Sequence, residues 1–345
     1  MEINDNQNKI LKFFLTRFLF LGLGISLILN LGENDSLIAI ILGYLQGIII
    51  ILIFNKLSNY INKKNDNKNI IDWLIKIMFV IYYLLLISIG TITFVCFIRD
   101  FFLPYTNTII SSIPFLFLAV FLSQKGIKAI AQSGKILLIV LLFSFLLTFF
   151  TLVSSISIEK FLPIFIIKKS SLFKASLSFA ILSTAPFLIM LDEHSSLKND
   201  IKIYSLGSLT IFLSTFIILG IFGSSLVKIF SYPEYTVLRQ IKAFGFLENI
   251  ENFIVLSWFF DIFITIAILF YKLKKNINIK NNYALYFISL ILLFIINHFV
   301  INNYIMIDYI FKYLVYTLLI FVFVIIILLS IKVLNFKSNE KYKQL

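Results

Sequence analysis

Charged side chains are scarce in this sequence. Asp, Glu, Lys and Arg make up 14% of its 345 residues, whereas hydrophobic residues make up 60%. A soluble domain of this length needs far more polar surface, so the composition excludes a separate water-soluble domain. The net charge of +13 would suggest nucleic acid for a soluble protein. Here the lysines lie in short loops between apolar runs, as the positive-inside bias requires, so we expect no nucleic acid partner.

Cysteine and histidine are almost absent. Cys96 is the single cysteine and lies inside an apolar run, which excludes an intramolecular disulfide and a cysteine-based metal cluster. The two histidines, His194 and His298, lie far apart along the chain and make a weak case for metal binding or catalysis. We therefore expect no catalytic residues, no metal and no cofactor.

Long apolar runs dominate the chain instead. A membrane-spanning helix needs about 20 mostly apolar residues. Spans one to ten are predicted at 11–31, 36–54, 73–98, 108–122, 136–153, 172–191, 203–227, 253–271, 283–300 and 307–331. The pattern predicts an all-α integral membrane protein with about ten transmembrane helices in the lipid bilayer.

The basic residues predict the orientation of these spans. With the N-terminus in the cytoplasm, the inner loops hold 20 of the 30 basic residues, Lys12 and Arg17 among them, and the outer loops hold 8. Lys76 and Lys312 lie within spans. This asymmetry predicts a multi-pass protein of the cell membrane with both termini in the cytoplasm.

One outer loop carries a helix signal. Ser231 and Glu234 are three residues apart, the spacing of a helix capping box, and Gly245 follows as an interruption. These residues predict a short external helix at 231–245 before span eight. The other long outer loop, at 156–171, contains Pro163 and apolar residues, which predicts a segment in the membrane interface.

Two spans contain helix-breaking residues. Span one carries Gly22, Gly24 and Ser26, and span six carries Ser183-Thr184-Ala185-Pro186. Irregular backbone at membrane depth is tolerated only beside protein or a water-filled cavity. If the ten spans are divided into two sets of five, each break lies in the first span of its set, a pattern that points to a transporter substrate site. Alternatively, the glycines permit close helix packing and the proline makes only a kink.

These residues form the predicted substrate site: Gly22, Gly24, Ser26, Ser183, Thr184, Ala185 and Pro186, together with Tyr82 of span three. Tyr82 could gate a cavity, although tyrosines in spans usually pack or lie at the interface.

Span eight carries a polar stripe. Ser257, Asp261 and Thr265 are four residues apart, so they share one helix face. An ionised Asp at the bilayer centre costs about 2.5–3.5 kcal/mol, so Asp261 is expected to face the bundle interior. The stripe could bind a coupling ion, H⁺ or Na⁺. The alternative is a structural ion pair, for instance with Lys76 or Lys312.

Several stretches resemble the spore germination membrane-permease family, the B subunits of nutrient germinant receptors within the amino acid–polyamine–organocation superfamily. The most specific stretch runs from Ser231-Tyr232-Pro233-Glu234-Tyr235 through Arg239-Gln240-Ile241 and Gly245-Phe246-Leu247-Glu248 to Trp258. Gly32-Glu33-Asn34-Asp35-Ser36 and Lys125-Gly126-Ile127-Lys128-Ala129 are similar to the family's first hairpin and its link into span five.

The resemblance implies a five-plus-five inverted repeat with broken helices one and six. The repeats would be 1–155 and 172–345, separated by the external loop 156–171, with a cytoplasmic tail at the end. It also implies a substrate site at the breaks, a cation-type site between spans one and eight, and A and C receptor subunits as partners. Span one lacks the proline that often follows its glycines in the family, and Ser183-Thr184-Ala185 replaces a Gly-Glu type break.

Two functions follow from these features, and both are non-enzymatic. The first is a permease-like subunit of a spore germinant receptor that binds a small, amino acid-like nutrient and triggers germination. The second is a free-standing transporter of amino acids coupled to protons or sodium. An integral-membrane enzyme is disfavoured, because the longest outer loop has only about twenty residues, typical of a connector.

Overall fold

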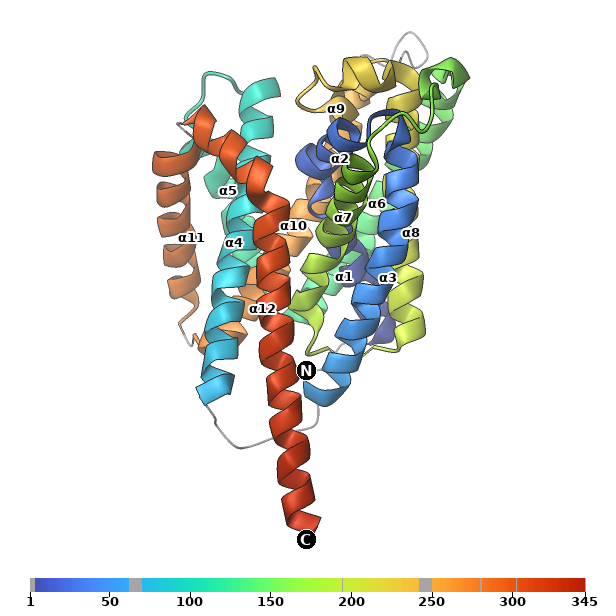
Figure 1. The fold of residues 1–345 in the computed structure, drawn as a ribbon. Helices are drawn as coiled ribbons and strands as arrows, with labels where there is room; N and C mark the ends of the chain where they lie inside the picture. Colours follow the sequence, from blue (N-terminus) through green and yellow to red (C-terminus); the bar gives the residue numbers. More distant parts are fainter. Residues whose placement is uncertain are drawn as a thin grey trace.

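A computed structural model describes residues 4–61, 70–193, 195–241, 250–279, 281–301 and 303–344, and they fold almost entirely into helices (Figure 1). The α-helices are α1 (Asp5–Arg17), α2 (Ile25–Gly32), α3 (Ser36–Ile61), α4 (Ile70–Phe101), α5 (Thr108–Gln124), α6 (Ile127–Leu152), α7 (Lys169–Thr184), α8 (Leu197–Val227), α9 (Pro233–Leu238), α10 (Ile250–Ile277), α11 (Asn282–Ile296) and α12 (Tyr304–Gln344). Short π or 3₁₀ turns join some of them: η1 (Phe20–Gly24), η2 (Glu33–Asp35), η3 (Val153–Ser155), η4 (Ile158–Phe161), η5 (Ala185–Met190) and η6 (Asn297–Ile301). Within the described residues, the chain contains no strand.

Each predicted span falls on a helical segment. Within the described residues, seven helical stretches are long and apolar enough to cross a membrane: Asp5–Asn59, Ile70–Phe101, Ile127–Ser155, Lys169–Met190, Leu197–Val227, Tyr283–Ile301 and Met306–Leu334. The first of these stretches contains spans one and two, which the 3₁₀ turn η2 separates. Span four corresponds to the shorter apolar helix Thr108–Gln124, and span eight lies within α10.

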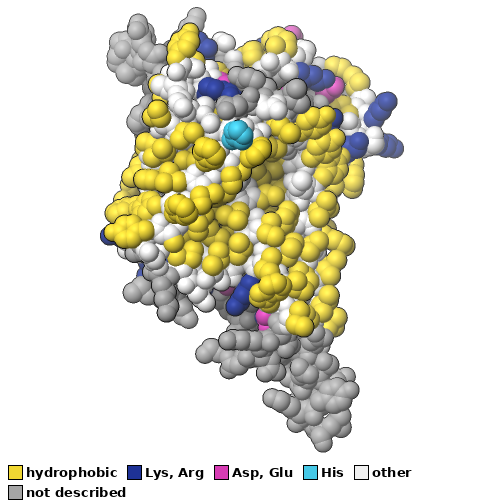
Figure 2. All heavy atoms as spheres, turned by 90° about the vertical axis from the view of Figure 1, so that its left-hand side faces the viewer, with side chains coloured by type: hydrophobic (Ala, Val, Ile, Leu, Met, Phe, Trp, Pro, Cys, Tyr) yellow, Lys and Arg dark blue, Asp and Glu magenta, His cyan; other side chains and the backbone are white. Residues whose placement is uncertain are grey.

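The outer surface of the bundle is apolar over a broad band (Figure 2). Large apolar side chains are also exposed on other helices, including Ile49 on α3, Phe143 on α6 and Phe323 on α12, each about 60% exposed. An exposed apolar band of this size marks contact with lipid. The chain is therefore an all-α, multi-pass membrane protein, and both of its ends lie toward the same end of the bundle (Figure 1).

Spans one, two, six and seven pack together, because α3 lies along α7 and α8, while α1 and α2 also contact both. Close packing depends on Gly47 of α3, since a Cβ atom there would overlap the hydroxyl of Tyr204 on α8. On the other side, α10 packs against α4, α5 and α6. Spans one and six, two and seven, three and eight, and four and nine are thus neighbours. The five-plus-five division stays a prediction, which these contacts support.

The external helix is shorter than predicted. Helix α9 covers Pro233–Leu238. The last part of the predicted 231–245 helix, from residue 242, and the Phe-Leu-Glu stretch that follows it lie outside the described residues. The start of α9 also differs from the prediction. The N-cap residue is Tyr232, without a side-chain cap, so the capping box predicted for Ser231 and Glu234 is wrong.

Candidate functional site

Span one is interrupted at the predicted glycines. Helix α1 ends at Arg17, and the π turn η1 leads into α2. Gly22 adopts φ +74°, a left-handed conformation that side chains with a Cβ rarely accept. A Cβ there would also lie 2.9 Å from Cγ2 of Thr93 and 3.2 Å from the ring of Tyr232. Both constraints explain the glycine, and the turn leaves the backbone N–H of Gly22 outside the helical hydrogen-bond pattern.

Glu234 of α9 accepts that N–H. Its Oε1 lies 2.5 Å from the nitrogen of Gly22, and the residue is 3% exposed. The carboxyl that appeared from its spacing to cap α9 therefore caps the broken span one, 212 positions away. Burial raises the pKa of Glu234 to about 7, although the hydrogen bonds from its own backbone and from Gly22 act in the opposite direction.

Span six changes from an α-helix to the 3₁₀ turn η5 at Ala185, next to Pro186. Ser183 and Thr184 donate to the carbonyls of Phe179 and Ala180, at 2.7 and 2.6 Å, within α7. The hydroxyl of Tyr82 on α4 donates to the carbonyl of Ala185 at 2.7 Å. Tyr82 is fully buried, so its hydrogen bond stabilises the backbone of span six at the break.

A cavity of about 1030 Å³ opens beside the break in span one, at the α9 end of the bundle. Gly22 and Ser26 line it, and so do Ser178 and Leu182 of α7. Other walls come from α4 and α12. Charges of both signs line the cavity, Lys174 on α7 and, on α4 and α12, Arg99, Asp100, Asp308 and Lys312. The described lining does not include Gly24, Tyr82 or Ser183 to Pro186. We call this space the outer cavity.

The polar stripe of span eight faces the bundle interior. Asp261 is fully buried, and its Oδ2 accepts from Nε of Arg17 at 3.1 Å. Arg17 also donates to the hydroxyl of Thr210 on α8, at 2.9 Å. Within the described part of the chain, Oδ1 of Asp261 and the hydroxyl of Thr265 have no hydrogen-bond partner. Arg17 of span one is thus bonded both to Asp261 of span eight and to Thr210 of span seven.

The prediction that Arg17 is an inner-loop charge is wrong, because Arg17 is 6% exposed inside α1 and pairs with Asp261. The same prediction for Lys12 is wrong, because Lys12 also lies in α1 and is 5% exposed. The ion-pair alternative for Asp261 named Lys76 or Lys312, yet Lys312 lines the outer cavity and the observed partner is Arg17. An arginine at the edge of an apolar run is the signal that could have revealed this pair.

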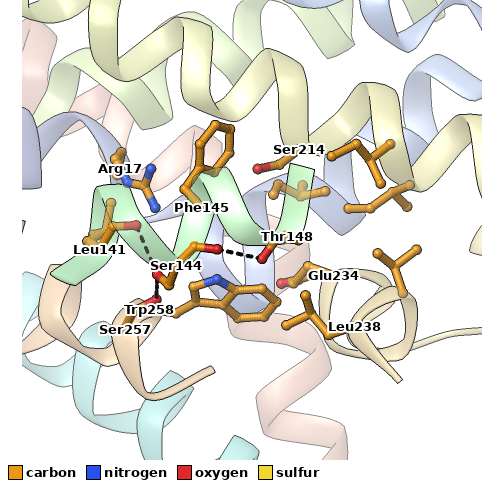
Figure 3. A pocket seen from close by; sticks show the side chains of 14 residues that line it. Arg17, Leu141, Ser144, Phe145, Thr148, Ser214, Glu234, Leu238, Ser257 and Trp258 are labelled. Atoms are coloured by element: carbon orange, nitrogen blue, oxygen red, sulfur yellow. Dashed lines mark hydrogen bonds between the residues drawn. The ribbon is translucent and has the colours of Figure 1, made fainter. Parts of the chain in front are cut away.

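A small pocket of about 40 Å³ connects these groups (Figure 3). Ser257 of the stripe lies beside it and shares a hydrogen bond of 2.7 Å with Ser144 on α6. Arg17 lies at one side of the pocket and Glu234 at the other, and the side chains of Thr148 and Ser214 also point into it (Figure 3). We call this space the polar pocket.

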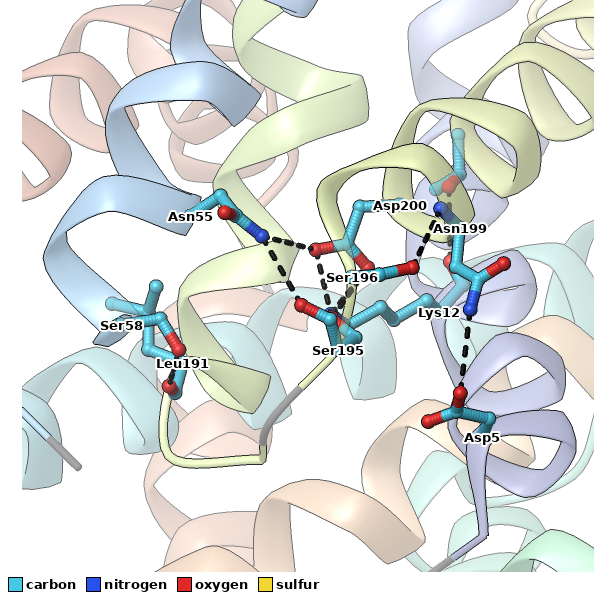
Figure 4. Close-up of polar contacts among 10 residues, drawn as sticks. Asp5, Lys12, Asn55, Ser58, Leu191, Ser195, Ser196, Asn199 and Asp200 are labelled. Carbon is cyan, nitrogen blue, oxygen red and sulfur yellow. Dashed lines mark hydrogen bonds and ion pairs between the residues drawn. The ribbon is translucent and has the colours of Figure 1, made fainter.

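The opposite end of the bundle is held shut by polar contacts (Figure 4). Lys12 of α1 pairs with Asp200 of α8 at 2.6 Å and donates to the hydroxyl of Ser195 at 2.6 Å. Asn55 of α3 donates to Asp200 and to the carbonyl of Ser195. Beside this cluster, Lys272 of α10 pairs with Asp192 and Glu193. Spans one, two, seven and eight are thus joined at the end near the chain termini.

A bundle of membrane helices with a cavity reaching a broken helix from one side and a polar seal on the other side is built like a permease. Sequence comparison narrows this class. The chain belongs to the spore germination protein family, whose sequence profile matches residues 8–304. It is 27% identical over 238 residues to "Putative spore germination protein YfkT" of Bacillus subtilis (strain 168). That match covers 65% of this chain and 66% of the relative, slightly less than two thirds of the relative's length.

Proposed function

We propose that this chain is the permease-like membrane subunit of a spore germinant receptor, and that it binds a small nutrient in the outer cavity. The observation that carries the proposal is the cavity itself, which reaches Gly22 and Ser26 at the break in span one. Its volume of about 1030 Å³ is at the upper end of the range for small-molecule sites. Nutrient binding at a broken helix would bias the arrangement of spans one and six, and so trigger germination.

The charges of the cavity favour an amino acid-like nutrient. Lys174 can face a carboxylate and Asp308 can face an ammonium group, while Arg99 and Asp100 pair with each other at 3.0 Å at the edge of the same cavity. Hydroxyl and amide groups of Ser26, Asn30 and Ser178 provide further hydrogen bonds. Gly24, Tyr82 and Ser183 to Pro186 shape the two breaks in this proposal, rather than contact the nutrient.

The proposed orientation places both termini in the cytoplasm and the outer cavity on the far side, where a nutrient arrives. Without Lys12 and Arg17, which lie buried in α1, the inner loops hold 18 of the 20 basic residues counted above, against 8 in the outer loops. This excess still favours the same orientation. The A and C subunits of a germinant receptor are the proposed partners, and we propose no enzymatic activity.

The stripe of Ser257, Asp261 and Thr265 remains the proposed ion or proton site of span eight. Its unpartnered oxygens at Asp261 and Thr265 support this role. The ion pair with Arg17 supports the structural alternative, because the guanidinium group already balances the charge of Asp261.

A nutrient-binding experiment tests the proposal. The purified protein in lipid nanodiscs is exposed to a panel of tritiated L-amino acids, and saturable binding of at least one of them is expected. Ser26→Trp places an indole ring in the cavity beside the break and should abolish that binding, whereas Ile49→Trp, on the lipid-facing side of α3, should leave it intact. Binding that persists unchanged in Ser26→Trp would place the nutrient elsewhere.

The second candidate is a free-standing amino-acid transporter coupled to protons or sodium. The combination of an open outer cavity with the Lys12–Asp200 seal favours it, since alternating access requires one end to close while the other opens. Uptake of the bound amino acid into vesicles that contain this chain alone would support transport. Binding without uptake, together with loss of germination in spores that lack the gene, would support the receptor subunit.

A further inference from the structure

Glu234 has an unusual environment for a carboxylate. Its Oε1 accepts the N–H of Gly22, but its Oε2 is buried and has no hydrogen-bond partner in the part of the chain that the structure describes. A buried carboxylate with an unpaired oxygen is costly while it is ionised. A proton on Oε2 removes that cost, so this geometry favours a carboxyl group that changes its charge state.

Two small spaces adjoin this carboxyl group. One is the polar pocket of about 40 Å³, which is large enough for a water molecule and is lined by hydroxyl groups (Figure 3). The other, of about 20 Å³, is lined by Glu234, Thr93 and Gly22. Gly22 also lines the outer cavity, so the broken backbone of span one lies between the cavity and the space beside Glu234.

The charged and titratable neighbours of Glu234 are few. From α1, Arg17 lines the same pocket, but its guanidinium group is bonded to Asp261 and Thr210. Tyr232 precedes α9 and is within electrostatic range of Glu234. The walls from α6, α8 and α10 offer the polar but uncharged side chains of Ser144, Thr148, Ser214, Ser257 and Trp258. Burial therefore dominates, and it raises the pKa of Glu234 to about 7.

We propose that Glu234 is a proton-binding site that is reached from the outer cavity, and that its charge state sets how tightly α9 holds the break in span one. When the carboxyl is ionised, it accepts a charge-assisted hydrogen bond from Gly22, which is roughly twice as strong as a neutral one. When the carboxyl is protonated, that bond weakens and α9 is held less tightly. The inference rests on the proposed function of the break as a nutrient site, and it makes the proton the coupled ion.

Infrared difference spectroscopy tests the proton site without any nutrient. Spectra of the wild-type protein recorded between pH 5.5 and 8.5 should show a carboxylic acid C=O band that disappears with a midpoint near pH 7. Glu234→Gln should lose this band, whereas Glu33→Gln, on the exposed η2 turn, should keep it. An identical difference spectrum in wild type and Glu234→Gln would overturn the proposal.

Wild-type protein with ¹³C-labelled glutamate carboxyls keeps the test decisive if Glu234→Gln fails to fold. The band should shift with the label, and a band that does not shift would overturn the proposal, because it would not come from a glutamate. The equilibrium constant for unfolding should also rise on the order of 100-fold as pH increases from about 4.5 to about 7, since the unfolded chain releases this proton first. A failed titration leaves amino-acid binding untouched, so the two proposals can fail separately.

Discussion

Replacement of Asp261 by asparagine removes the negative charge that faces Arg17 inside the bundle. The side chains of Arg17 and Asp261 are 8% and 0% exposed, so the pair lies away from bulk water. Removal of one partner from a buried ion pair costs about 3–5 kcal/mol, because the other charge is left uncompensated. Thr210 bonds Arg17 in both proteins and does not offset this cost. We expect Asp261→Asn to lower the free energy of unfolding by about that amount.

Removal of both charges should behave differently. A buried pair replaced by apolar residues of similar volume is often neutral or stabilising, so Arg17→Met with Asp261→Leu should recover most of the lost stability. The matched control is Glu33→Gln, which breaks an exposed pair with Lys228 and should cost about 0–1 kcal/mol. The assay is unfolding of the purified protein in nanodiscs, followed by tryptophan fluorescence. Wild-type stability of Asp261→Asn would refute the reasoning.

The same double variant distinguishes the two roles of the span-eight stripe. If Asp261 serves only to pair with Arg17, a stable double variant should bind nutrient and support germination normally. If Asp261 binds a coupling ion, the double variant should fold but fail to respond. The germination response of spores that carry the variant is the measurement.

Three further substitutions test other contacts. Gly22→Ala should abolish nutrient binding and lower the free energy of unfolding by more than about 1 kcal/mol. The new Cβ is strained by the positive φ, and it also overlaps neighbouring side chains. Gly126→Ala, at φ +92° in open space, should show the strain alone and leave binding intact. Tyr82→Phe removes the hydrogen bond to the buried carbonyl of Ala185 and should cost about 0.5–1.5 kcal/mol in the same unfolding assay. Lys12→Met removes the partner of Asp200, so a membrane-impermeant thiol reagent should label Ser58→Cys faster from the inner side; an unchanged labelling rate would contradict the role of that cluster as a seal.

Local patterns predicted what depends on neighbours along the chain. Apolar run length placed the spans, because a helix in lipid must satisfy its backbone within the segment. The Gly-x-Gly sequence around Gly22 and the proline at 186 predicted where helices change geometry. These features depend on local backbone chemistry, which a single sequence displays directly.

Contacts between distant residues could not be predicted in the same way. Arg17 and Asp261 are 244 positions apart, and Arg17 near the end of an apolar run resembled a loop charge. Glu234 had the right spacing to cap its own helix, yet its carboxyl binds the backbone of Gly22. In both cases, the partner is determined by how helices pack. A single sequence can mark a charge as buried, as it does for Arg17 in its apolar run, but it does not show which distant residue is the partner.

Helix α12 is much longer than a membrane span, and it extends well past the outer cavity. It contains 41 residues and therefore extends about 60 Å, roughly twice the hydrocarbon thickness of a bilayer. Leu319 lies at the outer cavity, and the helix continues for about 38 Å from there to Gln344. A tilt of about 5° at the cavity would move the far end by about 3 Å over that length. In the proposed orientation, helix α12 would carry a small movement at the proposed nutrient site to the cytoplasmic end of the bundle.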